Sequence, residues 1–160
     1  MIDRILFAAT LLALLGSGLI GGVFFAFSAF VMKALARRPP AEGIAAMQSV
    51  NTVILRSWFM TVFLVTAGLC VLALVHPLWH WQGPADRWRI AGAALYLAGG
   101  MLVTIACNVP RNEALEALAP GDPASAPLWA DYVSRWTRWN HVRTLACAAA
   151  SVAFGIALAT

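Results

Sequence analysis

The chain has 160 residues, of which 61% are hydrophobic and only 11% carry a formal charge, and its mean hydropathy is +0.77. This balance excludes an ordinary soluble domain, and the length leaves room for one domain, residues 1–160. The net charge of +4 requires no nucleic-acid partner, because basic residues beside anionic lipid headgroups account for it.

Four long runs of the chain lack charged residues. A helix needs about 20 apolar residues to cross the hydrocarbon core of a bilayer, and the last run reaches that length with the residues upstream of it. The first run exceeds the roughly 7–15 residues of a signal-peptide core, so we expect it to be retained. The sequence therefore predicts an all-α fold, a four-helix transmembrane bundle of up-down topology. The predicted spans are residues 5–33, 56–76, 90–109 and 140–159.

The basic residues predict how the bundle is oriented. Eight of them fall in the first and third connections, and the other side holds only Arg4, Arg87 and Arg89. The positive-inside rule then places these two connections in the cytoplasm, with amphipathic helical extensions, and both termini on the non-cytoplasmic side. The eight residues are Lys33, Arg37, Arg38, Arg56, Arg111, Arg135, Arg138 and Arg143.

The first two helices contribute aromatic and amide side chains. Phe24 and Phe27 share one helical face, which suits either a pocket wall or lipid and core contacts. After the Pro39-Pro40 turn, residues 41–56 are expected to form a helix that leads into the second span. That helix brings Asn51 to the edge of the membrane, where its amide can face the bundle.

The second connection carries a histidine pair, His76 and His80, at the spacing of a metal chelate. Pro77 is expected to end the helix that this spacing requires, and no third ligand lies nearby in the sequence, so a solvated loop is favoured and no metal site is predicted. The three cysteines all fall in apolar runs and indicate packing residues.

Polar clusters close the third helix and open the fourth. Asn108, Arg111 and Asn112 flank Pro110, and Trp136, Trp139, Asn140 and Arg143 share one stripe by their spacing at i, i+3, i+4 and i+7. His141 lies off that stripe. In an up-down bundle both clusters and Asn51 converge at one level, which favours a pocket because polar groups at membrane depth are costly unless they are paired or functional. The alternatives are that Asn108 bonds backbone groups freed by Pro110, that the arginines are topogenic charges and that the tryptophans form an interfacial belt.

Several motifs resemble one family. F-F-A-F-S-A-F-V-M from Phe24 to Met32, Met47-Gln48 with Asn51, the Asn108-to-Asn112 segment and W-x-x-W-N-x-x-R from Trp136 to Arg143 are similar to the small anthrone-oxygenase-like integral membrane family. The resemblance covers nearly the whole chain. Many members are bacterial proteins without an assigned activity, so it implies a multi-pass protein of the bacterial inner membrane. It also implies oxidation of a polycyclic anthrone, or a related phenolic aromatic, with dioxygen.

Anthrone oxidation needs a base, a positive or amide group for the enolate oxygen, and flat walls for the rings. Arg111 or Arg143, with Asn108 and Asn140, is expected to stabilise the oxyanion, and His141 is the default base because a histidine exchanges protons near neutral pH. The walls and further contacts are expected from Phe24, Phe27, Asn51, Asn112, Trp136 and Trp139. No cofactor is required for this chemistry.

Two other functions fit the same sequence. One is a redox protein with haem, bound by His141 and one of Met32, Met47 or Met101. The other is a non-catalytic bundle that binds a lipophilic aromatic or quinone, or a protein partner. Its small-residue faces, such as Gly18 and Gly22, suit association of helices, including homo-oligomers.

Overall fold

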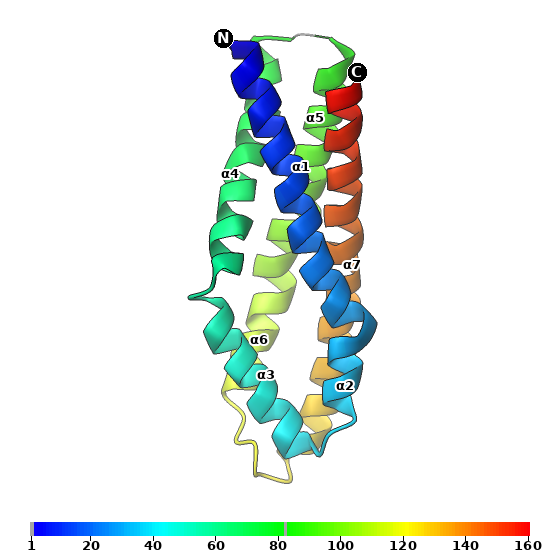
Figure 1. Ribbon diagram of the computed structural model, residues 1–160. Coiled ribbons are helices and arrows are strands. Elements are labelled where there is room, and N and C mark those ends of the chain that lie inside the picture. The colour runs from blue at the N-terminus through cyan, green and yellow to red at the C-terminus, as the bar shows by residue number, and fades with distance from the viewer. Residues whose placement is uncertain (1, 82) are drawn as a thin grey trace.

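The computed structural model describes residues 2–81 and 83–160. These residues form helices and short connections, without strands. In chain order the elements are α1 (Ile2–Ala26), the π-helical segment η1 (Phe27–Val31), α2 (Met32–Ala36), α3 (Pro40–Ile54), α4 (Trp58–Trp79), α5 (Pro84–Ala94), the π-helical segments η2 (Leu95–Leu102) and η3 (Thr104–Asn108), α6 (Val109–Glu116) and α7 (Ser125–Ala159). The four long helical stretches alternate in direction along the bundle, so both termini lie at the same end (Figure 1).

The predicted helical membrane bundle is confirmed. Within the described residues, four continuous helical stretches are long and apolar enough to cross a bilayer: Arg4–Ala36, Trp58–Trp79, Pro84–Glu116 and Ser125–Ala159. Large apolar side chains cover their outer surfaces, with Leu19 64% and Leu145 71% exposed. Such a surface is stable in lipid and not in water. The protein is therefore a multi-pass membrane protein.

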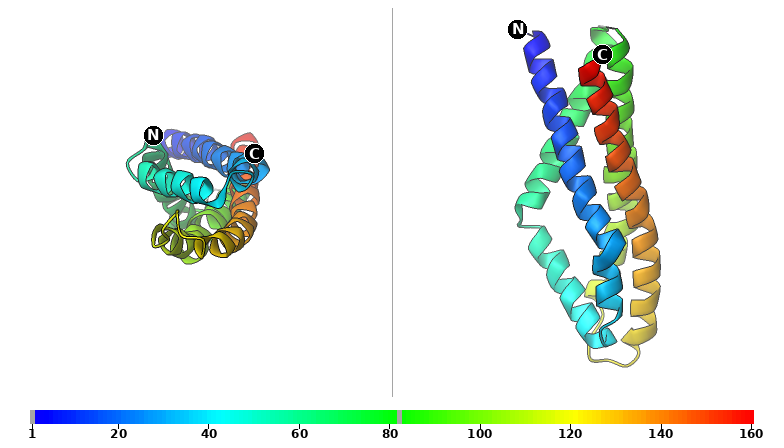
Figure 2. Two further views of the ribbon diagram at one scale, coloured as in Figure 1. Left: turned by 90° about the horizontal axis from the view of Figure 1, so that it is seen from below. Right: turned by 45° about the vertical axis from the view of Figure 1, so that its right-hand side comes forward.

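Two boundaries differ from the sequence prediction. Helix α4 continues through Pro77 to Trp79. The proline forgoes one helical hydrogen bond, and the bonding resumes after it, since the His80 N–H donates to the His76 carbonyl at 3.0 Å. The rings of His76 and His80 consequently lie 5.5 Å apart. The other difference is that α3 does not run into α4. The chain turns at residues 55–57, where Ser57 is extended, and α3 leaves at an angle to α4 (Figure 2, right).

Close helix contacts occur at glycines other than the Gly18–Gly22 pair. A Cβ on Gly99 would lie 2.2 Å from the Cβ of Ala146, and one on Gly16 would lie 2.0 Å from the Thr66 hydroxyl. At Gly22 a Cβ would meet nothing within 4 Å. Gly99 therefore sets the approach of the third stretch to α7, since any side chain there would push the two backbones apart.

The π-helical segments decide which residues of the third stretch face inward. Tyr96, Gly100 and Asn108 are buried, and Thr104 faces the bundle, although all four are spaced by four residues. In an α-helix, positions four apart drift by about 40° at each step, so this series would wind away from the core. The wider π-helical turns remove most of that drift and keep the series on one face.

Candidate functional site: an aromatic pocket around a buried arginine

Arg143 is the central residue of the site. It projects from the middle of α7, and only 5% of its surface is exposed. Among the described residues, the arginine–carboxylate ion pairs are Arg38–Glu42, Arg89–Asp86 and Arg135–Asp131, so no carboxylate neutralises Arg143. A buried cation without a counter-charge is expensive in a membrane protein and usually marks a functional group.

Asn140 holds this arginine in place. Its side chain is completely buried, and its Oδ1 accepts a hydrogen bond from Nη2 of Arg143 at 2.6 Å. The amide nitrogen donates to the carbonyl oxygen of Phe24 at 2.6 Å and contacts the Ser28 hydroxyl at 2.7 Å. Asn140 thereby ties α7 to α1 and η1, and it fixes the direction of the guanidinium.

Two aromatic rings and one hydroxyl complete the surroundings of Arg143. Its guanidinium carbon lies 4.1 Å from the centroid of the Phe24 ring and 5.1 Å from that of Trp136. These are cation–π distances. Nη1 donates to the Thr104 hydroxyl at 3.2 Å, while Nε is buried and makes no hydrogen bond within the protein.

A cavity of about 130 Å³ lies directly against Arg143, between α1, α3 and α4. Its walls are mostly aromatic and aliphatic, with Phe59 and Phe63 stacked at 5.9 Å and Phe24 set edge-on to both rings. Arg143 is the one charged residue among the described residues that line it. The α3–α4 break adds Ile54 and Leu55 to the lining. The lining thus combines apolar rings with one cation, which suits an apolar group that carries a negative or strongly polar oxygen.

Asn112 and Asn51 supply the amides of this pocket. The Oδ1 atom of Asn112 accepts hydrogen bonds from the Trp136 indole at 2.8 Å and the Tyr132 hydroxyl at 3.0 Å, which orients the indole. Asn51 also lines the pocket, and its amide nitrogen is buried near Tyr132.

The structure thus gathers Phe24, Phe27, Asn51, Asn112, Trp136 and Arg143 around one cavity. Asn140 and Asn108 stand behind it as supports. Asn108 does not bond the backbone near Pro110, as one interpretation expected, because its amide donates to the Trp136 carbonyl oxygen on α7 at 3.3 Å.

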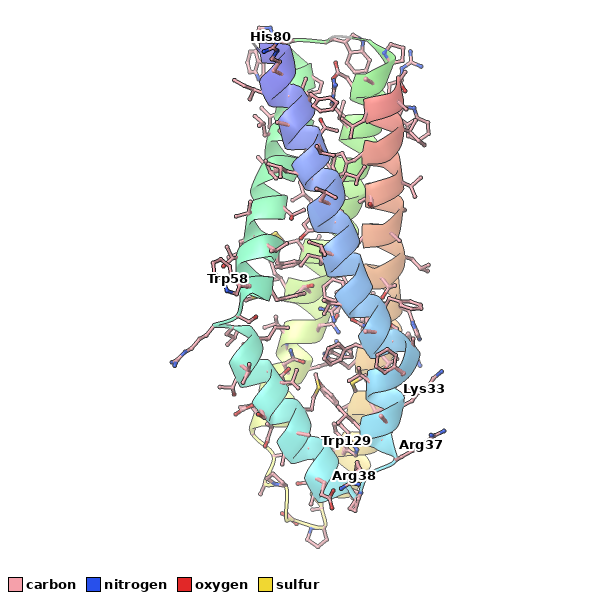
Figure 3. The ribbon with its side chains drawn as sticks, viewed as in Figure 1. Lys33, Arg37, Arg38, Trp58, His80 and Trp129 are labelled. Carbon is pink, nitrogen blue, oxygen red and sulfur yellow. The ribbon has the colours of Figure 1, made fainter. Side chains whose placement is uncertain are left out.

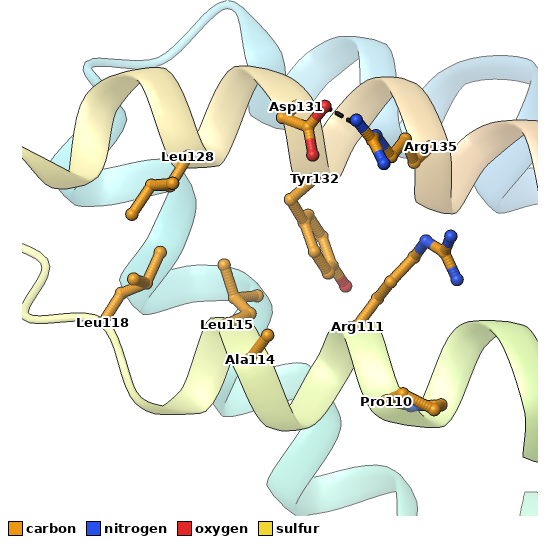
Figure 4. Close-up of a pocket in the computed structure, with 9 residues that line it drawn as sticks. All are labelled: Pro110, Arg111, Ala114, Leu115, Leu118, Leu128, Asp131, Tyr132 and Arg135. Carbon is orange, nitrogen blue, oxygen red and sulfur yellow. Dashed lines mark hydrogen bonds and ion pairs between the residues drawn. The ribbon is translucent and has the colours of Figure 1, made fainter.

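Three predicted site residues lie elsewhere. Arg111 bonds the Cys107 carbonyl and lines a separate groove between α6 and α7, together with Tyr132 and Arg135 (Figure 4). Trp139 is half-buried and does not line the cavity. His141 is exposed on another face of α7, in a shallow groove beside α2. On a helix His141 is rotated by about 140° from Trp136, so the two side chains face different neighbours.

Of the methionines considered for haem, Met32 is the one that lies beside the same groove as His141. Met47 lines the Arg143 pocket, Met101 packs on the hydrophobic core near Tyr96, and Met32 and His141 border the groove beside α2. Met32 is only 1% exposed there, so its sulfur is covered by neighbouring side chains. This arrangement offers no pair of axial ligands for a haem iron.

Sequence reasoning did not assign Ser28, Thr104 or Tyr132 to the site. Ser28 contacts Asn140, Thr104 accepts from Arg143, and Tyr132 donates to Asn112. Ser28 stands four residues after Phe24, on the same helical face, so its spacing could have placed it at the site. Thr104 gave no such signal, because its direction depends on the π-helical turns around it.

The fold and the site define a multi-pass helical membrane protein with an aromatic pocket built on an uncompensated arginine. The chain belongs to the anthrone oxygenase family, whose model matches residues 51–153. No curated protein and no solved structure matches it. The matched segment contains Asn51, Asn112, Trp136, Asn140 and Arg143, so most of the polar site lies within the part of the chain that the family model matches.

Proposed function

We propose that the protein oxidises a polycyclic or phenolic aromatic with dioxygen in the pocket around Arg143. The observation that carries this proposal is a buried guanidinium, without a carboxylate partner among the described residues, that borders an aromatic-walled cavity. Family membership supports the reaction class. Aromatic walls hold a flat ring system, and the cation stabilises a negative oxygen on that ring.

The reaction is the conversion of a ring CH₂ group, para to a carbonyl across the central ring, into a second carbonyl. Loss of a proton from the CH₂ gives an aromatic enolate whose oxygen pairs with Arg143. The enolate reduces dioxygen, and one oxygen atom enters the new C=O while the other leaves as water. Substrate carbon supplies all four electrons, so the balance requires no further reductant.

The sequence prediction used an arginine to stabilise the enolate oxygen and His141 to remove the proton. In this proposal Arg143 alone promotes both events. The described lining residues of the pocket include no histidine and no carboxylate. Deprotonation is therefore driven by stabilisation of the enolate in the pocket, with the proton released to water at its open side. Burial strengthens this effect, because charge interactions grow as the local dielectric falls.

We also propose that the pocket lies near the cytoplasmic face of a bacterial inner membrane. Arg143 is about 24 Å along α7 from Ala159, and the hydrocarbon core is about 30 Å thick. If the C-terminal end of α7 lies at one membrane–water interface, the pocket lies close to the opposite interface. The basic connections belong to this end, and they favour the cytoplasmic side.

The test is turnover of anthrone by the purified protein, measured as anthraquinone absorbance and oxygen uptake after subtraction of uncatalysed oxidation. We expect one dioxygen per anthraquinone, and a loss of about 100-fold in rate for Arg143→Met. Arg135→Met is the matched control, because Arg135 is on the same helix but is exposed and paired with Asp131. Equal rates for Arg143→Met and Arg135→Met would refute the proposal.

A second candidate is binding without catalysis. It is favoured by the lack of a titratable base among the described pocket residues. This function predicts saturable binding of an anthraquinone or quinone that depends on Arg143, together with no turnover above the uncatalysed rate.

A further inference from the structure

A second concave site lies on a different face of α7 from the pocket. It is a groove of about 370 Å³ between α2 and the middle of α7. Its lining combines apolar side chains, such as Met32 and Val133, with polar and basic ones. The lining residues that matter are Met32, Lys33, Ser134, Thr137, Arg138 and His141.

The groove is basic and contains no neutralising acid. Lys33, Arg138 and His141 are exposed along it, and no carboxylate occurs among its described lining residues. Neighbouring arginines behave differently, since Arg38 pairs with Glu42 and Arg135 pairs with Asp131. Figure 3 shows Lys33 extending outward from the bundle, where an external ligand can reach it. The groove thus concentrates positive charge that none of its described lining residues neutralises.

A hydroxyl group stands among these charges. The Thr137 hydroxyl oxygen is buried and has no hydrogen-bond partner within the protein, and Ser134 lies one turn before it. Hydroxyls and basic side chains together are the usual donors to phosphate oxygens. A phosphate group between Lys33 and Arg138 would meet both kinds of donor.

The surface that continues from the groove is apolar. Arg138, His141 and Leu145 follow one another at i, i+3 and i+7, so one stripe of α7 changes from basic to aliphatic. Leu145 is 71% exposed, and Phe30, one turn before Lys33, is 61% exposed. A free phosphate would leave these side chains uncovered, whereas an amphiphile would cover them with its hydrocarbon chains.

We propose that this groove binds the headgroup of an acidic glycerophospholipid, independently of the reaction in the Arg143 pocket. Lys33 and Arg138 contact the phosphate. The Thr137 hydroxyl, which neighbouring side chains cover in this structure, turns about χ1 to donate to it, and the acyl chains lie along Phe30 and Leu145. The site differs from diffuse attraction of basic residues to a membrane, because it combines concavity, a buried donor and unpaired cations in one place.

The experiment compares two double variants that remove the same charge. Lys33→Gln with Arg138→Gln alters the groove, and Arg38→Gln with Arg135→Gln alters two paired, exposed arginines. Each protein is equilibrated with mixed micelles of phosphatidylglycerol and phosphatidylcholine, and the retained lipid is counted by native mass spectrometry. We expect the preference for phosphatidylglycerol to fall about tenfold in the groove variant and to stay within about twofold in the control.

Thr137→Val gives an uncharged second variant, for which we expect a loss of about threefold to tenfold. Equal losses in both double variants would show diffuse charge attraction and overturn the proposal. Displacement of phosphatidylglycerol by millimolar inorganic phosphate would identify a free-phosphate site and would also overturn it. None of these measurements involves turnover, so failure here does not bear on the proposed oxidation.

Discussion

Asn140 and Arg143 form one unit across a single turn of α7, joined by a 2.6 Å hydrogen bond between the amide oxygen and the guanidinium. The same asparagine donates to the backbone carbonyl of Phe24, which lies 116 positions earlier in the chain. The ring of Phe24 in turn covers the guanidinium. The position of the cation thus depends on the contact between α1 and α7, and the fold and the site cannot be altered separately at Asn140.

Asn140→Leu is expected to destabilise the protein by about 3 kcal/mol, because it leaves the Phe24 carbonyl and Arg143 without their buried partner. Thermal unfolding in detergent measures this loss. The control is Ser151→Ala, which removes one hydrogen bond between the same two helices, from Ser151 to the Leu14 carbonyl. It is expected to cost about 1 kcal/mol. Similar melting temperatures for the Asn140 and Ser151 variants would contradict the central role of Asn140.

Arg143 is expected to bind the anionic form of an aromatic ligand. A hydroxyanthraquinone, titrated by quenching of tryptophan fluorescence, should bind Arg143→Met about 30-fold more weakly than the wild type. Arg143→Lys keeps the charge but loses the fork of donors, so a smaller loss is expected. The difference between wild type and Arg143→Met should widen as pH rises through ionisation of the ligand. A difference that does not change with pH would argue against charge pairing.

Gly99 and Gly22 make a matched pair for helix packing. Gly99→Ala is expected to cost about 1–3 kcal/mol, because its Cβ would meet Ala146 at 2.2 Å. Gly22→Ala meets nothing within 4 Å and should be neutral or stabilising, since alanine favours a helix. The midpoints of thermal unfolding test both. A stable Gly99→Ala protein would mean that α7 and the third stretch are less closely packed than described.

His141→Ala tests whether His141 or water takes the proton from the substrate. Because His141 is exposed and lies outside the pocket, we expect anthrone turnover in detergent to stay within about twofold of the wild type, with an unchanged pH profile. Loss of turnover with retained ligand binding would restore His141 as the base. It would require α7 to present another face to the substrate during the reaction.

The fold followed from composition, since four uncharged runs of the required length leave few alternatives in a bilayer. The stripe of Trp136, Asn140 and Arg143 was also predictable, because helical spacing alone places these residues together. Spacing could not show that Trp139 turns away from the cavity or that Arg111 folds back onto the Cys107 carbonyl. Nor could it show that Arg143 has no carboxylate partner among the described residues. Those properties depend on neighbouring helices.

The ends of helices were less predictable. Pro77 was expected to end α4, but a proline in a final turn costs one hydrogen bond, and the helix continues past it. The break at residues 55–57 contains no glycine or proline, and the one signal for it is Ser57, a residue type common just before a helix. This break brings Leu55 and Ile54 to the pocket.

The π-helical turns of the third stretch determine how this chain would respond to a change in its length. A π-helical turn is equivalent to an α-helical turn with one residue inserted. Deleting a single residue there would let the segment relax to an α-helix and still cross the bilayer, but every side chain beyond the deletion would rotate. Thr104 and Asn108 would leave the guanidinium and the Trp136 backbone, and other residues would replace them. A one-residue deletion between Gly100 and Thr104 would thereby exchange the residues that face Arg143 and leave the Gly99 contact with α7 in place.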